Sequence, residues 1–253
     1  MVDNPSVLKT AAERAESLPR AVQLKRLVLF DIDGTLLHSD GAGREAIRQA
    51  LLAVYGTAGP IETFSFAGNT DYQNFVGLLR GAGLSQEEIA ARLPQAMALY
   101  PQRLREIIGR FRVRTCPGVA PLLERLTAHP ELEVALLTGN LEEAAWIKLR
   151  AAGLDRFFTW GAFGSEARER TELPPVAVEK AHQRTGRRFA GKEIVIIGDT
   201  PADITCGQPL GVRTLAVATG PYPREALRAW EPDFLFEDLA DADAVLEAIL
   251  RPL

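Results

Sequence analysis

Two acidic residues, Asp31 and Asp33, stand two positions apart at the end of an apolar run, RLVLFDIDGT. Side chains alternate between the two faces of a strand, so residues two apart project in the same direction. Paired carboxylates repel each other and are costly to bury. A divalent cation would remove that cost, as would an anion-handling site with one acid protonated. A local turn at DIDG is the alternative, but a turn needs only one of the two acids.

A second acidic pair, Asp199 and Asp203, follows another apolar run in IIGDTPAD. Thr200, Pro201 and Asp203 fit the first positions of a helix, so capping alone can explain Asp203. Asp199 caps nothing obvious and is better explained as a metal ligand. Because the available ligands are all oxygens, the metal that we expect is Mg²⁺.

A third run, LLTGN, offers an anion site. Thr138 supplies a hydroxyl group, and Gly139 leaves a backbone N–H unshielded beside a helix start, which suits a phosphate group. Asn140 and Glu143 form a good capping pair, so we interpret Asn140 as a structural residue.

These motifs need elements that bring them together. Five apolar runs are predicted to be strands, at residues 26–33, 133–140, 157–164, 193–200 and 213–220, and helical patterns separate them. Strands that alternate with helices indicate a parallel sheet with both faces covered. Such sheets bind ligands beyond the carboxyl ends of their strands, where all three motifs fall.

One connection is different from the others. After the first strand, about 75 residues carry helical periodicity only, which is too long for a loop. We therefore expect an inserted helical cap, in which Thr70 and Gln73 form a capping box. In the same stretch, Asp71 and Asn69 are weak candidates for substrate contact.

Composition limits the class of protein. Of 253 residues, 47% are hydrophobic and 25% are charged, which excludes a disordered or fibrous protein. The net charge of −4 argues against a broad nucleic-acid-binding surface. The apolar runs are shorter than a membrane span, and the first 20 or so residues lack the apolar core of a secretion signal. We expect a soluble, cytoplasmic protein, in which Cys116 and Cys206 form no disulfide framework.

Together the motifs resemble the haloacid dehalogenase-like (HAD) hydrolase superfamily. DIDGTL, LLTGN and GDTPAD match three of the family's four motifs in order, spacing and position at strand ends. The long insert after the first motif looks like the helical cap of phosphoglycolate phosphatase-like members. The resemblance implies an α/β fold with a three-layer, Rossmann-like parallel sheet. The implied segments are a core at 25–38 and 114–253, a cap at 39–113 and an N-terminal helical extension at 1–24.

The resemblance also implies roles for single residues. Asp31 would be the nucleophile that becomes an aspartyl phosphate, and Asp33 would protonate the leaving oxygen and then activate water. The Asp31 carboxylate, the Asp33 backbone carbonyl and Asp199 would hold Mg²⁺, with Asp203 in support. The phosphoryl oxygens would be held by Gly34, Thr138 and Gly139, together with Arg170 as the basic residue of the family's third motif.

The family's third motif, usually a lysine near a proline ahead of a helix, is not plain in this chain. Lys192 begins a strand, Lys180 lies inside a helix, and Lys148 follows the second motif by more than two helical turns. Matching RTELPP to the family pattern assigns the position to Arg170, with Arg168 as the alternative. Arginine keeps the positive charge and can bind two oxygens at once.

The activity implied by the resemblance is Mg²⁺-dependent hydrolysis of a small phosphorylated metabolite. The insert has no lysine, which argues against Schiff-base chemistry, and the acid at Asp33 argues against dehalogenation. A phosphomutase on the same core stays an alternative, as does a phosphate-binding protein without activity. The sequence indicates no nucleic-acid or membrane partner and leaves the substrate and oligomeric state open.

Overall fold

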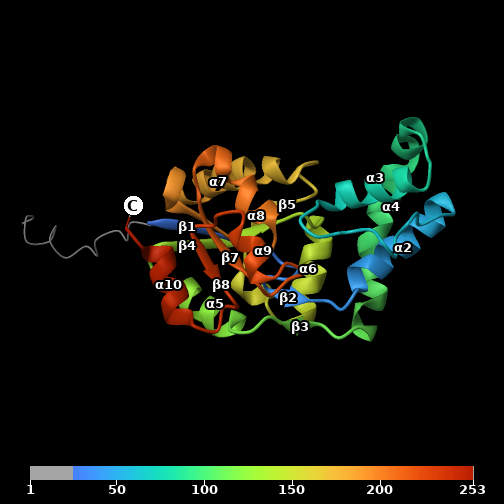
Figure 1. Ribbon diagram of the computed structural model, residues 1–253. Coiled ribbons are helices and arrows are strands. Elements are labelled where there is room, and N and C mark those ends of the chain that lie inside the picture. The colour runs from blue at the N-terminus through green and yellow to red at the C-terminus, as the bar shows by residue number, and fades with distance from the viewer. Residues whose placement is uncertain (1–24, 253) are drawn as a thin grey trace, which may run out of the picture.

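A six-stranded parallel sheet forms the centre of the computed structural model, which describes residues 25–252 (Figure 1). The strand order is β5-β4-β1-β6-β7-β8. The strands are β1 (Arg26–Phe30), β4 (Leu132–Thr138), β5 (Gly161–Phe163), β6 (Ile194–Gly198), β7 (Arg213–Val217) and β8 (Phe234–Phe236). The N-terminal extension expected at residues 1–24 lies outside the described residues.

Strand β1 is the centre of this sheet because it is apolar on both faces and wholly buried. It pairs with β4 on one side and with β6 on the other, so that Phe30 lies opposite both Leu136 and Ile197. The carboxyl ends of these three strands therefore meet at one edge of the sheet. The three motifs found in the sequence follow directly from those ends.

Helices cover both faces of the sheet and make three layers. On one face Val28 and Phe30 pack against α5 (Val119–Ala128), α6 (Glu142–Ala151) and α10 (Ala242–Leu250). On the other face Leu27 and Leu29 pack against α7 (Leu173–Thr185) and α8 (Pro201–Cys206). Figure 1 shows α7 above the sheet and α5 and α10 below it. The short helix α9 (Arg224–Arg228) lies between β7 and β8 in the chain. The predicted α/β fold class is confirmed.

All five predicted strands are present in the six-stranded sheet, but the prediction missed the sixth strand of that sheet and extended the other five too far. The strands end up to three residues before the predicted limits, because the polar motif residues lie in the loops beyond them. The missed strand, β8, has only three residues, which are half-buried at the edge of the sheet. So short a run gives no clear periodic signal.

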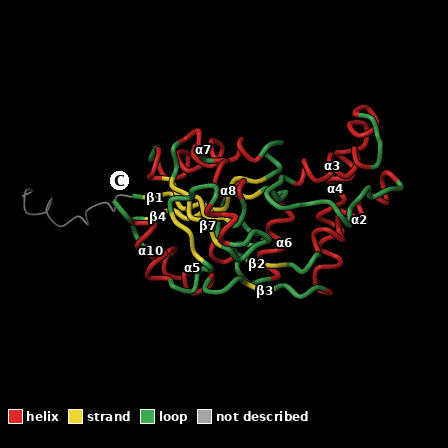
Figure 2. Tube along the Cα trace, in the orientation of Figure 1, coloured by secondary structure: helices red, strands yellow, loops and turns green. Residues whose placement is uncertain are grey.

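Three helices form the insert that follows β1, and they lie to one side of the sheet (Figure 2). They are α2 (Ala42–Tyr55), α3 (Asp71–Gly81) and α4 (Gln86–Ile107). They share a core of their own, in which Ile47, Phe75 and Tyr100 are almost completely buried. A small antiparallel pair of strands, β2 (Leu37–His38) and β3 (Arg114–Thr115), lies where the chain enters and leaves the insert. Residues 25–252 contain no helix that is both long and apolar enough to span a bilayer.

Candidate active site

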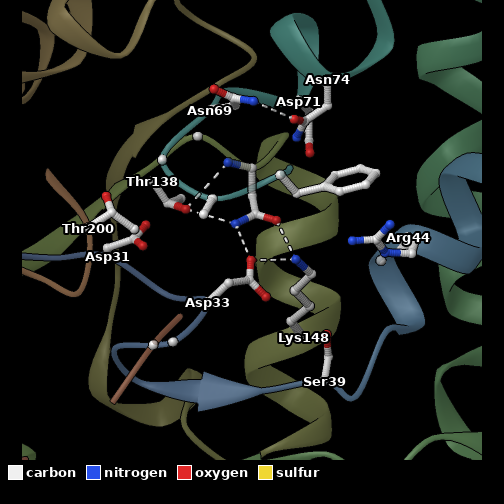
Figure 3. Close-up of a pocket in the computed structure, with 18 of the residues that line it drawn as sticks. Asp31, Asp33, Ser39, Arg44, Asn69, Asp71, Asn74, Thr138, Lys148 and Thr200 are labelled. Atoms are coloured by element: carbon white, nitrogen blue, oxygen red, sulfur yellow. Dashed lines mark hydrogen bonds and ion pairs between the residues drawn. The ribbon is translucent and has the colours of Figure 1, made fainter. Parts of the chain in front are cut away.

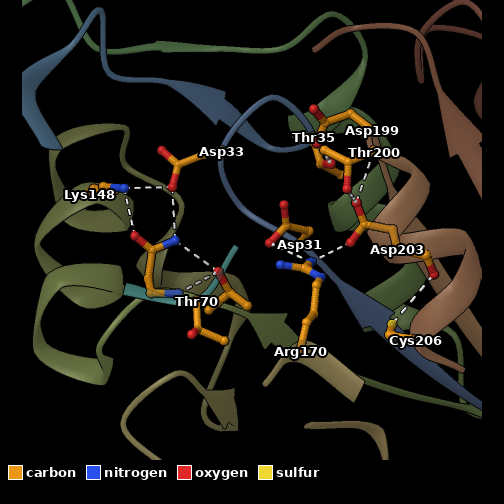
Figure 4. A network of polar contacts seen from close by, with 12 residues as sticks. Asp31, Asp33, Thr35, Thr70, Lys148, Arg170, Asp199, Thr200, Asp203 and Cys206 are labelled. Carbon is orange, nitrogen blue, oxygen red and sulfur yellow. Dashed lines mark hydrogen bonds and ion pairs between the residues drawn. The ribbon is translucent and has the colours of Figure 1, made fainter. Parts of the chain in front are cut away.

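Asp31 is the first residue beyond β1 and the centre of a cluster of buried charges (Figure 4). Its N–H donates to the Ile197 carbonyl at 3.0 Å, which extends the pairing of β1 with β6 by one residue. The carboxylate is buried, and burial raises its pKa to about 6, although the nearby Arg170 guanidinium works in the opposite direction. Asp31 thus lies within the protein where an unpaired charge is unfavourable.

Asp199 and Asp203 come from the loop after β6 and from the start of α8. One oxygen from each of Asp31, Asp199 and Asp203 lies within 4.8 Å of the others. Burial and the charges of Asp203 and Asp31 raise the pKa of Asp199 well above its ordinary value. Its Oδ1 accepts a hydrogen bond from Thr35 Oγ1 at 2.7 Å, whereas its buried Oδ2 has no hydrogen-bond partner among the described residues.

This arrangement fits a divalent cation. Three buried carboxylates repel one another, and an unpaired carboxylate oxygen in the interior carries a substantial free-energy cost. A hard cation would relieve both, and an oxygen-only donor set suits Mg²⁺. Glycine is required beside this cluster, because a Cβ atom at Gly34 or Gly220 would collide with Asp199 Oδ2.

Asp203 uses its two oxygens differently. Oδ2 accepts from the Thr200 N–H at 3.0 Å and from the Thr200 hydroxyl at 2.7 Å, so the predicted cap at the start of α8 is present. Oδ1 accepts from Arg170 Nη2. Capping therefore explains the contacts of Oδ2 but not the contact of Oδ1 with Arg170.

Arg170 lies against the carboxylate of Asp31, to which the family resemblance gives the role of nucleophile. It begins a short 3₁₀ turn before α7, its side chain is buried, and its Nη2 lies 3.1 Å from Asp31 Oδ1. The alternative, Arg168, is exposed, and its guanidinium stacks on the ring of Tyr72 at 5.1 Å. The structure thus brings Arg170, and not Arg168, to Asp31.

Thr138 and Gly139 lie at the end of β4, which pairs with β1 on the side opposite to β6. The Thr138 hydroxyl is buried and accepts from the Asn140 amide at 2.8 Å. Gly139 passes so close to the insert that a Cβ atom there would collide with the backbone carbonyl of Asn69. The Gly139 carbonyl accepts from the Asp71 N–H at 2.7 Å.

The interpretation of Asn140 as a helix cap is wrong. Helix α6 begins one residue later than the sequence suggested, with Leu141 at the N-cap and no hydrogen bond from its side chain. Asp71 of the insert accepts from the Leu141 N–H instead. The Asn140 amide is therefore released from capping and donates to Asp33 Oδ2 at 2.8 Å.

The distance of Lys148 from the second motif along the chain argued against a place in the site, but the structure brings it there. Its Nζ lies 2.5 Å from Asp33 Oδ2 and 2.6 Å from Asn140 Oδ1. The residue is seven positions, or about two turns, beyond Leu141, so both lie on one face of α6. Helical side chains lean toward the N-terminus, and the long lysine chain reaches back to the site. That periodicity was the signal that could have found it.

The pocket that these residues line has a volume of about 380 Å³ and is closed on one side by the insert. The core contributes Asp31, Asp33, Thr138, Lys148 and Arg170, and the insert contributes Arg44, Asn69, Asn74 and Tyr100. Figure 3 shows Asp33, Lys148 and Arg44 around the open space. Of the two weak candidates, Asp71 accepts from Leu141, and the Asn69 amide donates to Asn74 Oδ1 at 3.1 Å.

Comparison with known proteins identifies the family. The haloacid dehalogenase-like hydrolase family matches residues 25–211, and the chain belongs to this family of hydrolases. It is an enzyme of this family with a helical insert after the first strand.

Individual relatives agree with this assignment. Phosphoglycolate phosphatase 1 of Pseudomonas aeruginosa is 26% identical over 240 residues, which cover 91% of this chain and 84% of that protein. Pyrophosphatase PpaX of Halalkalibacterium halodurans is 25% identical over 225 residues, which cover 85% of this chain and 93% of that protein.

Solved structures show the same fold. A hydrolase from Pseudomonas syringae superposes with a TM-score of 0.66 at 21% identity, covering 88% of this chain and 98% of the other. CbbY from Rhodobacter sphaeroides, solved in complex with phosphate, gives a TM-score of 0.65 at 16% identity and covers 86% and 96% of the two chains.

Proposed function

We propose that this hydrolase is a Mg²⁺-dependent phosphatase that cleaves a small phosphate monoester through an aspartyl phosphate on Asp31. The observation that carries the proposal is the position of Asp31, which has Arg170 3.1 Å from one oxygen and Asp199 and Asp203 in the same cluster. A carboxylate that attacks phosphorus needs cations to balance the charge of the phosphoryl group. The family and its phosphatase relatives support the same chemistry.

The reaction has two steps. A carboxylate oxygen of Asp31 forms a bond to phosphorus while the bond to the leaving oxygen breaks, and Asp33 gives that oxygen a proton. Asp33 then takes a proton from a water molecule that attacks the aspartyl phosphate, which releases phosphate and restores Asp31. Asp33 suits this second role because it is half-exposed at the pocket, whereas Asp31 is buried.

Positive and neutral donors surround the place where the phosphoryl group would lie. Arg170 is a buried guanidinium that can bind two oxygens, and Asp203 and Asp31 raise its pKa despite its burial, so it stays charged. The Thr138 hydroxyl and the backbone of Gly139 lie beside the start of α6. We assign these groups and Gly34 to the phosphoryl oxygens.

The metal would be held by the Asp31 carboxylate, the backbone carbonyl of Asp33 and Asp199, with Asp203 supporting them through Arg170 and Thr200. A bound Mg²⁺ supplies positive charge that stabilises the developing charge on the phosphoryl group. The unpaired Asp199 Oδ2 is the atom that most clearly lacks a partner without it.

The size of the pocket limits the size of the leaving group. Helices α2, α3 and α4 of the insert face a pocket of about 380 Å³, which suits a small metabolite rather than a polymer. We place the cap at residues 39–113, with the core at 25–38 and 114–253.

Phosphate release from p-nitrophenyl phosphate, measured with Mg²⁺ or with EDTA, tests this function. We expect metal-dependent turnover by the wild type and no turnover by Asp31→Asn. Asp243→Asn, at an exposed aspartate on α10, is the matched control and should behave like the wild type. Turnover that survives in Asp31→Asn would exclude Asp31 as the nucleophile, and turnover that persists in EDTA would exclude the metal.

A further inference from the structure

Asp33 is held by two donors, of which Asn140 ends the motif LLTGN and Lys148 lies in the helix that follows it, α6. Lys148 Nζ lies 2.5 Å from Asp33 Oδ2, and Asn140 Nδ2 donates to the same oxygen at 2.8 Å. Lys148 also donates to the Asn140 carbonyl oxygen at 2.6 Å. The three side chains close a ring of hydrogen bonds, which Figures 3 and 4 show beside the pocket.

The lysine of this ring is buried although it is charged. Its side chain is 6% exposed, against 42% for Asp33. A buried ammonium group is unfavourable unless a carboxylate and further hydrogen-bond acceptors compensate it, and here Asp33 and Asn140 do so. The insert packs against it, since a Cβ atom at Gly43 would lie 3.4 Å from Lys148 Nζ, at van der Waals contact.

The same ring reaches the phosphate side of the pocket. The Asn140 amide that donates to Asp33 also donates to Thr138 Oγ1 at 2.8 Å. The planar side-chain amide of Asn140 therefore links Asp33 to Thr138 and fixes the distance between them. Arg170 takes no part in this ring, since its contacts are to Asp31 and Asp203.

We propose that Lys148 is a positioning residue for Asp33, an inference that rests on the proposed function. Lys148 and Asn140 hold Asp33 Oδ2, so that Oδ1 is left to carry the proton to the leaving oxygen. In that step the bond from Asp31 to phosphorus forms, the bond to the leaving oxygen breaks, and the proton moves from Asp33 Oδ1 to that oxygen. Proton transfer requires that the acid lie within hydrogen-bond distance of the leaving oxygen. If the Asp33 carboxylate turned away from that oxygen, it could not transfer the proton.

The dependence of the rate on the leaving group separates this role from a general structural one. A nitrophenolate leaves without a proton, whereas an unsubstituted phenolate depends more on the acid. Phenyl phosphate and p-nitrophenyl phosphate have similar shapes, and kcat/KM reports the steps up to departure of the leaving group. A defect in Asp33 positioning should therefore be larger for phenyl phosphate.

The experiment compares kcat/KM of the full chain with Mg²⁺ for both esters. We expect Lys148→Met to lose about a hundredfold on phenyl phosphate and less than about tenfold on p-nitrophenyl phosphate. The loss should fall on kcat rather than on KM, and Lys148→Arg should recover part of it. Lys180→Met is the matched control, because Lys180 pairs with Glu166 away from the pocket.

A double-mutant cycle tests whether Lys148 acts through Asp33. In an Asp33→Asn background, adding Lys148→Met should cause no further loss on phenyl phosphate. Equal losses on both esters, a change confined to KM, or additive effects in the cycle would each overturn the proposal. If circular dichroism shows that Lys148→Met does not fold, Lys148→Gln takes its place in the same comparison.

The two proposals fail in different ways. Wild-type protein that hydrolyses neither ester would overturn the phosphatase function and the role of Lys148 with it. Wild-type turnover that requires Asp31, together with a Lys148→Met variant as active as Lys180→Met on phenyl phosphate, would overturn the role of Lys148 alone.

Discussion

Asp71, the first residue of α3 in the insert, accepts a hydrogen bond at 2.7 Å from the backbone N–H of Leu141 at the start of α6 in the core. The Asp71 N–H donates in turn to the Gly139 carbonyl at 2.7 Å. A residue 70 positions earlier thus caps α6, the helix that carries Lys148. The N-cap residue of α6 itself, Leu141, offers no side-chain hydrogen bond. These two hydrogen bonds join the insert to the core at the end of the motif LLTGN.

Removal of this cap should weaken both the fold and the site. We expect Asp71→Ala to lower the free energy of unfolding by about 1–2 kcal/mol, as for other lost caps, and to lower kcat/KM because Gly139 and Lys148 lose their support. Urea unfolding and p-nitrophenyl phosphate turnover measure the two effects. Asp241→Ala removes the exposed cap of α10 and should affect stability alone; equal turnover in the two variants would contradict this prediction.

The charge of Asp71 should make stability depend on pH. Burial raises its pKa from 3.8 to about 6 in the folded protein. Below about pH 4 the group is protonated in both states, and above about pH 6 the folded state carries the cost of the buried charge, so its contribution to stability falls as pH rises between them.

Asp71→Asn removes this dependence while it keeps an oxygen that can accept from Leu141. Relative to the wild type, the variant should gain stability from pH 4 to pH 7, by an amount on the order of 2 kcal/mol. Urea unfolding at both pH values measures the difference, with Asp243→Asn as the exposed control. A difference that stays constant with pH would mean that Asp71 has the same pKa in both states.

Arg170 should be needed for stability as well as for turnover. Its removal leaves the buried carboxylates of Asp31 and Asp203 without their cation, and the loss of one partner of a buried ion pair typically costs about 3–5 kcal/mol. We expect that loss in Arg170→Met, together with loss of phosphate release. Arg168→Met, which removes the exposed guanidinium over Tyr72, should leave turnover near the wild-type value.

Arg170→Lys separates charge from geometry. The lysine keeps the positive charge but has no planar fork with which to bind two carboxylates. Its stability and kcat should lie between those of the wild type and Arg170→Met. A variant as active as the wild type would show that a point charge is sufficient at this position.

Mg²⁺ should stabilise the protein through Asp199. A ligand present at a hundred times its dissociation constant adds about 2.7 kcal/mol to the free energy of unfolding, so the melting temperature of the wild type should rise with Mg²⁺. Asp199→Asn should lose most of that rise, yet be the more stable protein in EDTA because one charge leaves the cluster. An identical Mg²⁺ response in both proteins would place the metal elsewhere.

Much of the molecule was predictable from short stretches of sequence. The apolar runs that end at Asp31, Thr138 and Asp199 predicted three buried strands, and parallel strands deliver their carboxyl ends to one edge of a sheet. The meeting of these residues therefore followed from local pattern and topology. The helical insert was equally clear, because its periodicity extends over many turns.

Only the tertiary structure decided the partners of the polar side chains. The sequence pattern predicts that Asn140 caps α6 and that Lys148 lies too far from the second motif to reach the site. In the structure both contact Asp33. Asn140 is free to do so because Asp71 of the insert caps α6 instead. A hydrogen bond depends on positions to within a few tenths of an ångström, and these positions are fixed by how the insert packs against the core. Local sequence determines which strand ends carry the acids, whereas contacts between distant segments determine which donor holds each one.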